Sequence, residues 1–239
     1  MKGKKVAELS AIAENANYET GFNAQLMDFR YQTIKSFLKG SRGLEIGSAD
    51  GFMTKRLLNH FEELHVVEPV AQYSENVRKL SGIVVHNCLF EDFEPDLKFD
   101  TVIMCHVLEH VDNPVELLQK AKDVVKDNGR VIVTVPNADS IHRHIGIKMG
   151  LLDRLDQLNE TDRRIDHKRV YFFKGLKEHI DEGGLRTVKK LGFFVKFLSN
   201  DQMEKLDERL IQALYEISDD FKDHCSSIGY VCVKKKPAR

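Results

Sequence analysis

The chain has no tryptophan, only 5 prolines in 239 residues, and 4 cysteines that form no Cys-x-x-Cys pair. Cys88, Cys105, Cys225 and Cys232 lie far apart, and no histidine cluster stands near them at the spacing of metal ligands. We therefore predict no disulfide framework, no structural zinc and no other metal site. Cys88 and Cys105 lie in apolar runs, where reduced thiols behave as small hydrophobic side chains in a cytoplasmic protein.

An excess charge of one sign and a long apolar run are also missing. The 36 Lys and Arg residues nearly balance the 37 Asp and Glu residues, so there is no basic field to attract nucleic acid. No stretch approaches the roughly 18 apolar residues of a membrane span, and the basic N-terminus leads into no apolar signal core. We expect a soluble, cytoplasmic protein with neither nucleic acid nor a membrane as partner, and we leave a homodimer open.

The chain contains enough apolar residues, 42% of the total, to bury the core of one domain. No internal repeat, low-complexity tract or linker divides it. We predict a single domain over residues 1–239. Its expected parts are an N-terminal helical segment at 1–41, a core of alternating strands and helices at 42–136, a polar insertion at 137–172 and a closing part at 173–239.

Apolar runs alternate with helical patterns from about residue 42 onward. They predict strands at 43–47, 64–68, 83–87, 100–105 and 130–136, with helices at 52–61, 71–80 and from 113 or 114 to about 127. The run at 100–105 is apolar throughout, which is typical of a strand buried on both faces of a parallel sheet. The polar stretch from 137 to 170 interrupts the alternation and contains two short helical patterns.

The two ends of the chain complete the predicted sheet. A helix at 174–190, a strand at 193–198, a charged helix at 204–221 and a strand at 229–233 are expected, with the last two strands antiparallel. Two amphipathic helices are expected before residue 41, with Ile34, Phe37 and Leu38 forming a core stripe. The predicted fold is a doubly wound, mostly parallel, seven-stranded α/β sheet with helices on both faces and an insertion after the fifth strand.

The most informative motif is Glu45-Ile46-Gly47-Ser48-Ala49-Asp50-Gly51, between the first strand and the first helix of the core. Small residues at such a turn let the backbone bend sharply and approach a ligand closely. The carboxylate of Glu45 would repel a pyrophosphate, but it suits the cationic amino-acid part of a ligand. Glu68 ends the second strand, where a carboxylate can accept hydrogen bonds from ribose hydroxyls.

The segment from about 42 to 136 resembles the class I S-adenosylmethionine-dependent methyltransferases, in particular the small-molecule branch with Leu-Glu-His-Val after the fourth strand, here at 108–111. The glycine motif of that family reads acidic-x-Gly-x-Gly-x-Gly, and Ala49 replaces its middle glycine. The resemblance implies S-adenosyl-L-methionine as cofactor. The cofactor-binding residues that we assign are Glu45, Gly47, Ser48, Ala49, Gly51, Glu68, Pro69, Cys88, Leu89, Phe90, His106 and Val107.

The adenine position departs from the family pattern, which often has an acidic residue after the third strand. This chain has Asn87-Cys88-Leu89-Phe90 there, so we expect Leu89 or Phe90 to contact the ring instead. A Rossmann-like domain for another nucleotide is the alternative interpretation. Glu109 and His110 are expected to cap or brace the helix that follows them.

The acceptor is expected to bind against the polar insertion. Residues 137–144 leave the sheet on the side where doubly wound folds bind ligands. A hydroxyl acceptor needs a base, and a histidine suits that role near neutral pH. The candidates are His142 and His144, followed by His167. A separate set of basic residues would either bind a phosphate or carboxylate of the acceptor or form a solvated face: Arg143, Lys148, Arg163, Arg164 and Arg169.

These features favour O-methylation of a hydroxyl on a polar small molecule, such as a sugar or a secondary metabolite. The main alternative is N-methylation of a small-molecule amine, and a further one is a non-catalytic cofactor-binding subunit. The segment after the fourth strand reads Cys105-His106-Val107-Leu108 rather than Asn-Pro-Pro-Tyr, which disfavours methylation of base amines in nucleic acids.

Overall fold

The structure is a computed structural model that describes Val6, Ser10 and residues 20–235. Its centre is one seven-stranded sheet in the order β3-β2-β1-β4-β5-β7-β6. The strands are β1 (Arg42–Ile46), β2 (Glu63–Val67), β3 (Ile83–His86), β4 (Phe99–Cys105), β5 (Val125–Pro136), β6 (Leu185–Phe193) and β7 (Ser227–Lys234). The first five strands are parallel, and β7 is antiparallel to both β5 and β6. The predicted doubly wound sheet with its antiparallel end is confirmed.

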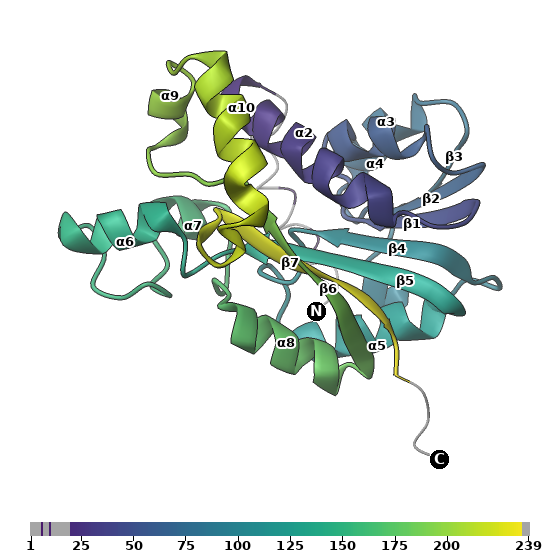
Figure 1. Ribbon diagram of the computed structural model, residues 1–239. Coiled ribbons are helices and arrows are strands. Elements are labelled where there is room, and N and C mark those ends of the chain that lie inside the picture. Colours follow the sequence, from purple (N-terminus) through teal and green to yellow (C-terminus); the bar gives the residue numbers. More distant parts are fainter. Residues whose placement is uncertain (1–5, 7–9, 11–19, 236–239) are drawn as a thin grey trace.

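Helices cover both faces of the sheet (Figure 1). Helices α2 (Gly21–Ile34) and α3 (Phe52–Leu57) lie on one face, and α5 (Pro114–Val124) and α8 (Phe173–Glu182) lie on the other. Helix α4 (Ala71–Arg78) follows β2 and contacts β3. The central strand β4 contributes side chains to the apolar core on both faces of the sheet. Val102 and Met104 pack on the face covered by α5, and Ile103 packs on the face covered by α3. All three side chains are fully buried, as the uninterrupted apolar run predicted.

The N-terminal core stripe is confirmed in part of its length. Ile34 is fully buried at the end of α2, and Phe37 and Leu38 pack against the same cluster while remaining half-buried. The first of the two predicted N-terminal helices falls almost entirely outside the described residues. Among the described residues, no helix is both long and apolar enough to cross a membrane.

The predicted elements after residue 174 need correction. The helix ends at Glu182 rather than near 190, because Gly183 and Gly184 follow it and Gly184 has a φ of 77°, which stops the helix. Strand β6 then runs over 185–193, where we had expected the end of that helix. A register shift between Thr187 and Lys189 interrupts the apolar–polar alternation, which hid this strand from the sequence analysis.

The predicted helix at 204–221 is also divided. Helix α9 (Asn200–Met203) precedes it, α10 (Glu208–Glu216) covers its centre, and 3-10 turns at Ile217–Asp219 and Lys222–His224 lead into β7. The predicted strand at 193–198 overlaps the sheet only at Phe193, because residues 194–198 leave β6 and pack with α10 around Phe194 and Val195.

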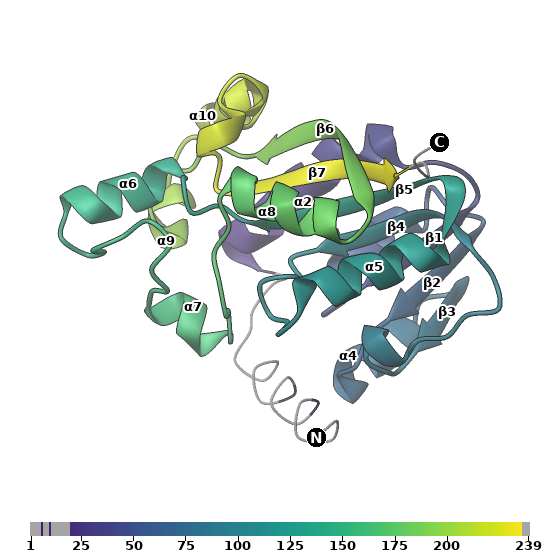
Figure 2. The same ribbon diagram turned by 90° about the horizontal axis from the view of Figure 1, so that it is seen from below.

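The insertion after β5 contains the two expected short helices, α6 (Ile141–Lys148) and α7 (Glu160–Arg164). Helix α6 projects beyond the sheet in both views (Figures 1 and 2). The buried Arg143 holds the insertion together, because its Nε donates to the carbonyl of Leu155 at 2.6 Å and its guanidinium lies 3.3 Å from the carboxylate of Asp162. This arrangement places the insertion at the edge where β4 and β5 end.

Candidate functional site

The loop after β1 has the backbone that its small residues allow. Gly47 and Gly51 have φ values of 73° and 83°, in the left-handed region that glycine adopts without strain. Ala49 also has a positive φ, of 45°. An L-residue in this region loses about 1–2 kcal/mol relative to its usual conformation. The loop therefore keeps the backbone shape of a glycine loop, although alanine adopts this conformation less readily than glycine.

Glu68 at the end of β2 fixes this loop through hydrogen bonds to its backbone. The side chain is 4% exposed, and its Oε2 accepts from the backbone N–H groups of Ser48 at 2.9 Å and Ala49 at 3.1 Å. Its Oε1 accepts from the N–H of Val70 at 2.9 Å. Burial raises the pKa of Glu68 although these hydrogen bonds oppose the shift. The carboxylate thus sets the loop geometry in this structure, and contact with a ribose stays a prediction.

Glu45 lies inside β1 directly beneath the loop. It is 3% exposed, and its Oε2 accepts a hydrogen bond from Oγ1 of Thr54 at 2.6 Å. Burial raises its pKa to about 8, so without a ligand the carboxyl is mostly protonated at neutral pH. A cationic amino group placed beside it would favour the ionised form. The residue therefore suits the amino-acid end of S-adenosylmethionine, and the contact that the motif predicts stays a prediction.

The remaining cofactor candidates differ in accessibility. Val107 adjoins the loop, since its Cγ2 lies 3.3 Å from the position that a Cβ on Gly47 would occupy. Leu89 and Phe90 are only 8% and 4% exposed and belong to the apolar core, and Cys88 packs against that core while half-buried. Pro69 is half-buried beside Glu68, and the side-chain amide of Asn87 donates to its carbonyl at 3.1 Å. An adenine contact by Leu89 or Phe90 remains a prediction, and it would involve only the small exposed part of either side chain.

A buried cluster of charge and imidazole follows β4. His106 has a φ of 59°, and its Nδ1 lies 3.0 Å from Oε1 of the fully buried Glu109. Burial lowers the pKa of His106 to about 4, and Arg30 adds to the shift. Burial opposes ionisation of Glu109, but His106, His110 and His167 together lower its pKa well below the usual value. At neutral pH His106 is therefore neutral, and Glu109 is a fully buried carboxyl group beside it.

Asn113, rather than Glu109 or His110, caps helix α5, since its side-chain oxygen accepts from the N–H of Glu116 at 3.3 Å. Glu109 is instead joined to the insertion. Its carbonyl accepts from the N–H of Lys168 at 2.7 Å, and Arg169 donates to the carbonyl of Leu108 at 2.7 Å. This clamp holds residues 167–169 against the turn after β4.

The three histidines that the sequence nominated as bases lie in different surroundings. The side chain of His167 is 7% exposed, its Nδ1 lies 2.9 Å from Oδ1 of Asp162, and its ring meets His110 edge-on with centroids 4.8 Å apart. His142 is partly buried, and its Nδ1 has no hydrogen-bond partner among the described residues. Burial lowers the pKa of His142 to about 3, and the charge of Lys196 contributes.

His144 is separated from that cluster. Its side chain is 48% exposed, and its Nε2 lies 2.7 Å from Oδ1 of Asp139. Together with His224 it lines a surface hollow of about 490 Å³. The structure thus places His167 against Asp162 and leaves Nδ1 of His142 buried without a partner among the described residues, whereas His144 faces a separate hollow.

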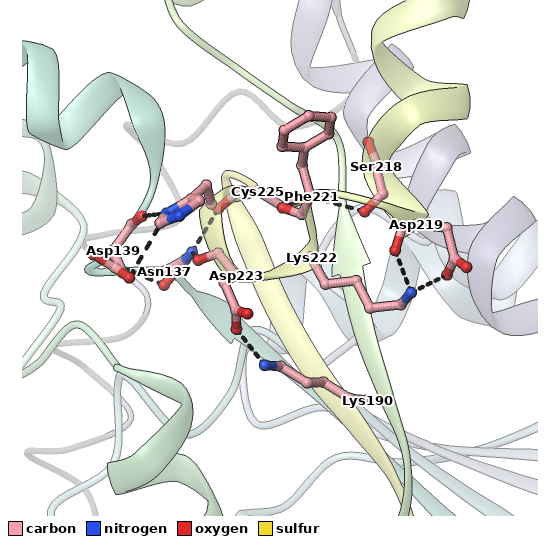
Figure 3. Close-up of polar contacts among 10 residues, drawn as sticks. Asn137, Asp139, Lys190, Ser218, Asp219, Phe221, Lys222, Asp223 and Cys225 are labelled. Carbon is pink, nitrogen blue, oxygen red and sulfur yellow. Dashed lines mark hydrogen bonds and ion pairs between the residues drawn. The ribbon is translucent and has the colours of Figure 1, made fainter.

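The start of the insertion is fixed to the segment before β7 (Figure 3). The side-chain amide of Asn137 donates to the carbonyls of Asp223 and Cys225, both at 2.8 Å, and its oxygen accepts from the N–H of Asp139 at 2.9 Å. These bonds span nearly the whole C-terminal half of the chain. They position the loop that leads from β5 into α6.

Two residues of this region were missed by the sequence analysis. Lys196, after β6, is half-buried, and this burial lowers its pKa to about 8. Arg30 of α2 is half-buried, and its Nε is buried without a partner among the described residues. Neither belongs to a recognisable motif, because each reaches the site from an element distant in sequence. Of the predicted anion-binding residues, Arg143 and Arg169 are occupied by the chain itself, whereas Lys148, Arg163 and Arg164 are exposed.

The parallel sheet, the left-handed loop after β1 and the acidic residues at the ends of β1 and β2 together define a class I, Rossmann-like methyltransferase domain. A profile of the methyltransferase domain family matches residues 16–190, most of the chain. The chain therefore belongs to this family, and its cofactor is S-adenosylmethionine.

Individual relatives are distant. An uncharacterized protein of Methanocaldococcus jannaschii is 27% identical over 110 residues, which are 46% of this chain and 51% of that protein. A highly reducing polyketide synthase of Emericella nidulans is 24% identical over a region that makes up 66% of this chain and 7% of the synthase. This chain thus matches about half of the first relative and a small part of the second.

Solved structures show the same fold. The N-methyltransferase NodS of Bradyrhizobium japonicum, in complex with S-adenosyl-L-homocysteine, aligns with a TM-score of 0.56 at 13% identity. The alignment covers 90% of this chain and 88% of NodS. At this identity the likeness supports the fold and leaves the acceptor open.

Proposed function

We propose that this protein transfers a methyl group from S-adenosylmethionine to a hydroxyl of a polar small molecule, such as a sugar or a secondary metabolite. The observation that carries the proposal is a set of buried polar atoms beyond β4 and β5 that have no hydrogen-bond partner among the described residues. They are Nε2 of His106, both carboxylate oxygens of Glu109, Nδ1 of His110, Oγ of Ser140 and Nδ1 of His142.

Unpaired polar groups in a protein interior are costly, at about 1–3 kcal/mol each. A ligand with several hydroxyls would supply the missing donors and acceptors, whereas an apolar quinol would leave them unpaired. The polarity of this cluster therefore favours a polyhydroxylated acceptor over an aromatic one.

The cofactor supplies a sulfonium methyl group, and the acceptor oxygen bonds to that carbon as the carbon–sulfur bond breaks. The chain has to align the two reactants and take up the hydroxyl proton. His167 lies against Asp162 and Nδ1 of His142 is buried without a partner among the described residues, whereas His144 faces a separate surface hollow. The proton acceptor is thus His142 or His167 in this proposal.

Single alanine substitutions of the three histidines test it. The turnover number of His142→Ala or of His167→Ala should fall by about 10²–10⁴, the usual contribution of a general base. The affinity for S-adenosylhomocysteine should change little, because the glycine loop is not altered. His144→Ala should keep turnover close to that of the unmodified protein. Near-normal turnover in all three variants would exclude a histidine base.

N-methylation of an amine is the second candidate, and Glu109 favours it specifically. A buried carboxyl group without a good hydrogen bond would attract an amine-bearing acceptor. Release of S-adenosylhomocysteine should be measured with separate pools of nucleotide sugars, free amines and amino acids, and phenols and quinols. Turnover confined to the amine pool would replace the hydroxyl proposal with this one.

A further inference from the structure

Three side chains from two distant segments converge at the clamp between the turn after β4 and the insertion. Glu109, His110 and His167 each offer one metal-ligand atom, and these atoms all lie within 4.8 Å of one another. Glu109 is fully buried, and the side chain of His167 is 7% exposed. The sequence predicted no metal because its histidines and cysteines show no ligand spacing, and only the fold brings this set together.

The hydrogen bonds around the two imidazoles leave one ring nitrogen of each available. Nδ1 of His167 lies 2.9 Å from Oδ1 of Asp162, so it carries the proton and Nε2 keeps its lone pair. The ring of His110 is hydrogen-bonded to the backbone of Asp166, whereas its Nδ1 is buried without a partner. A carboxylate or a carbonyl behind each ring is the arrangement that orients histidine ligands of metals.

The third ligand supplies charge. No hydrogen bond of good geometry reaches either oxygen of Glu109 from the described residues, although Oε1 lies 3.0 Å from Nδ1 of His106. Two fully buried carboxyl oxygens without a hydrogen bond are costly in the low dielectric of the interior, and a metal cation bound to them would supply the missing partner. Two nitrogen lone pairs beside it are a poor environment for an alkali ion and a good one for a transition metal.

We propose that Glu109, His110 and His167 bind one divalent transition-metal ion such as Zn²⁺ at the acceptor site. Two nitrogens and one carboxylate oxygen are a common ligand set of catalytic zinc, which keeps a further position open. In a tetrahedral site such ligands stand about 3.4 Å apart, so the side chains need to close by roughly 1 Å. Oxygen-preferring ions such as Mg²⁺ are disfavoured by the two imidazoles.

This inference rests on the proposed function and narrows it. The metal would bind the acceptor hydroxyl at its open coordination position and make the hydroxyl proton easier to remove. His167 is then a metal ligand, which leaves His142 as the group that takes the proton. Because burial lowers the pKa of His142, it is a weak base, and the transfer depends on the metal making the hydroxyl more acidic. Asp162 becomes a positioning residue, held in turn by Arg143 at 3.3 Å.

Metal binding can be measured without any acceptor. The tag-free full-length protein is stripped with a chelator, titrated with Co²⁺ or Zn²⁺, desalted and analysed by mass spectrometry for metal content. The cobalt form is also examined by visible absorption, since an intense d–d band reports low-coordinate binding. We expect one ion per chain. His110→Ala, His167→Ala and the nearly isosteric Glu109→Gln should each weaken binding by tenfold or more.

A matched control exists in the same chain. Asp139, His144 and His224 form a second cluster of equal size, but it is exposed. His224→Ala should therefore retain the metal and its absorption band. Asp162→Asn should weaken binding by about 10–100-fold, the usual effect of removing a partner behind a histidine ligand. Circular dichroism and binding of S-adenosylhomocysteine confirm that each variant is folded.

The outcomes are separable from those of the methyl-transfer assay. An unmodified protein that retains no metal, or one whose metal is lost in His224→Ala and kept in His167→Ala, overturns the metal site and leaves the methyltransferase proposal intact. Retention of metal with no turnover on any acceptor pool supports the site and instead contradicts the proposed acceptor.

Discussion

At the scale of single residues, Glu45 shows how burial and function oppose each other. The fully enclosed carboxyl is held protonated in the free protein because burial raises its pKa to about 8. A cofactor with a cationic amino group reverses that preference by supplying a countercharge. The residue is therefore suited to bind the cofactor, and it lowers the stability of the empty protein at high pH.

The pH dependence of stability follows from the sign of this shift. Between the ordinary pKa of a glutamate and about 8, the folded state holds a proton that the unfolded state has lost, so stability falls as pH rises. The slope from this one group is at most about 1.4 kcal/mol per pH unit. We predict that Glu45→Gln, which keeps an acceptor for Thr54, flattens this decline. Urea unfolding at several pH values measures it, and parallel curves for both proteins would contradict the assignment.

Ala49 illustrates a departure from a motif that the backbone tolerates. The family glycine at this position is replaced, yet the residue still adopts the left-handed conformation, with a φ of 45°. The backbone N–H groups of Ser48 and Ala49 donate hydrogen bonds to Glu68, and these bonds compensate for the cost of the left-handed conformation. The backbone conformation of the glycine loop is thus kept at Ala49 although the residue is not glycine.

At the scale of elements, the loop between β5 and α6 depends on one side chain. Asn137 donates to two carbonyls of the segment before β7 and is 1% exposed (Figure 3). We predict that Asn137→Ala lowers the free energy of unfolding by about 2–4 kcal/mol, because the buried carbonyl of Cys225 and the partly buried carbonyl of Asp223 lose their donor.

The same substitution at the exposed Asn128 is the matched control and should change stability by less than about 0.5 kcal/mol. Thermal and urea unfolding give both values. Equal effects at the two positions would show that the bonds of Asn137 contribute nothing specific. Turnover of Asn137→Ala should also fall, since α6 carries His142.

Sequence patterns predicted well the elements that are evenly buried or that begin at a clear capping signal. The strand at 100–105 is buried on both faces, so its apolar run was unambiguous, and Asn113 with Pro114 marked the start of α5. Strand β6 escaped because it carries a register shift and exposed lysines. Its place at the sheet edge removes the periodicity on which such predictions depend.

At the scale of the whole molecule, the cofactor should act as a stabiliser. S-adenosylhomocysteine binds only the folded state, so at about 100 times its dissociation constant it adds about 2.7 kcal/mol. For a chain of this size we predict a rise in melting temperature of about 5–10 °C. Scanning calorimetry measures the shift, and Glu68→Ala, which releases the loop amides, should abolish most of it. No shift in the unmodified protein would contradict the cofactor assignment.

The sequence by itself determined the layered sheet, the glycine turn with Glu45 and Glu68, and the family, because these depend on local periodicity and on short motifs. It also predicts that the insertion forms the wall of the acceptor site, and this stays a prediction. It placed His142 and His144 ahead of His167 as candidate bases, but burial and partners decide which imidazole is available, and these come from the tertiary structure. Only the tertiary structure brought Glu109 and His110 against His167, because the clamp through Lys168 and Arg169 joins segments whose proximity is set by the order of the strands.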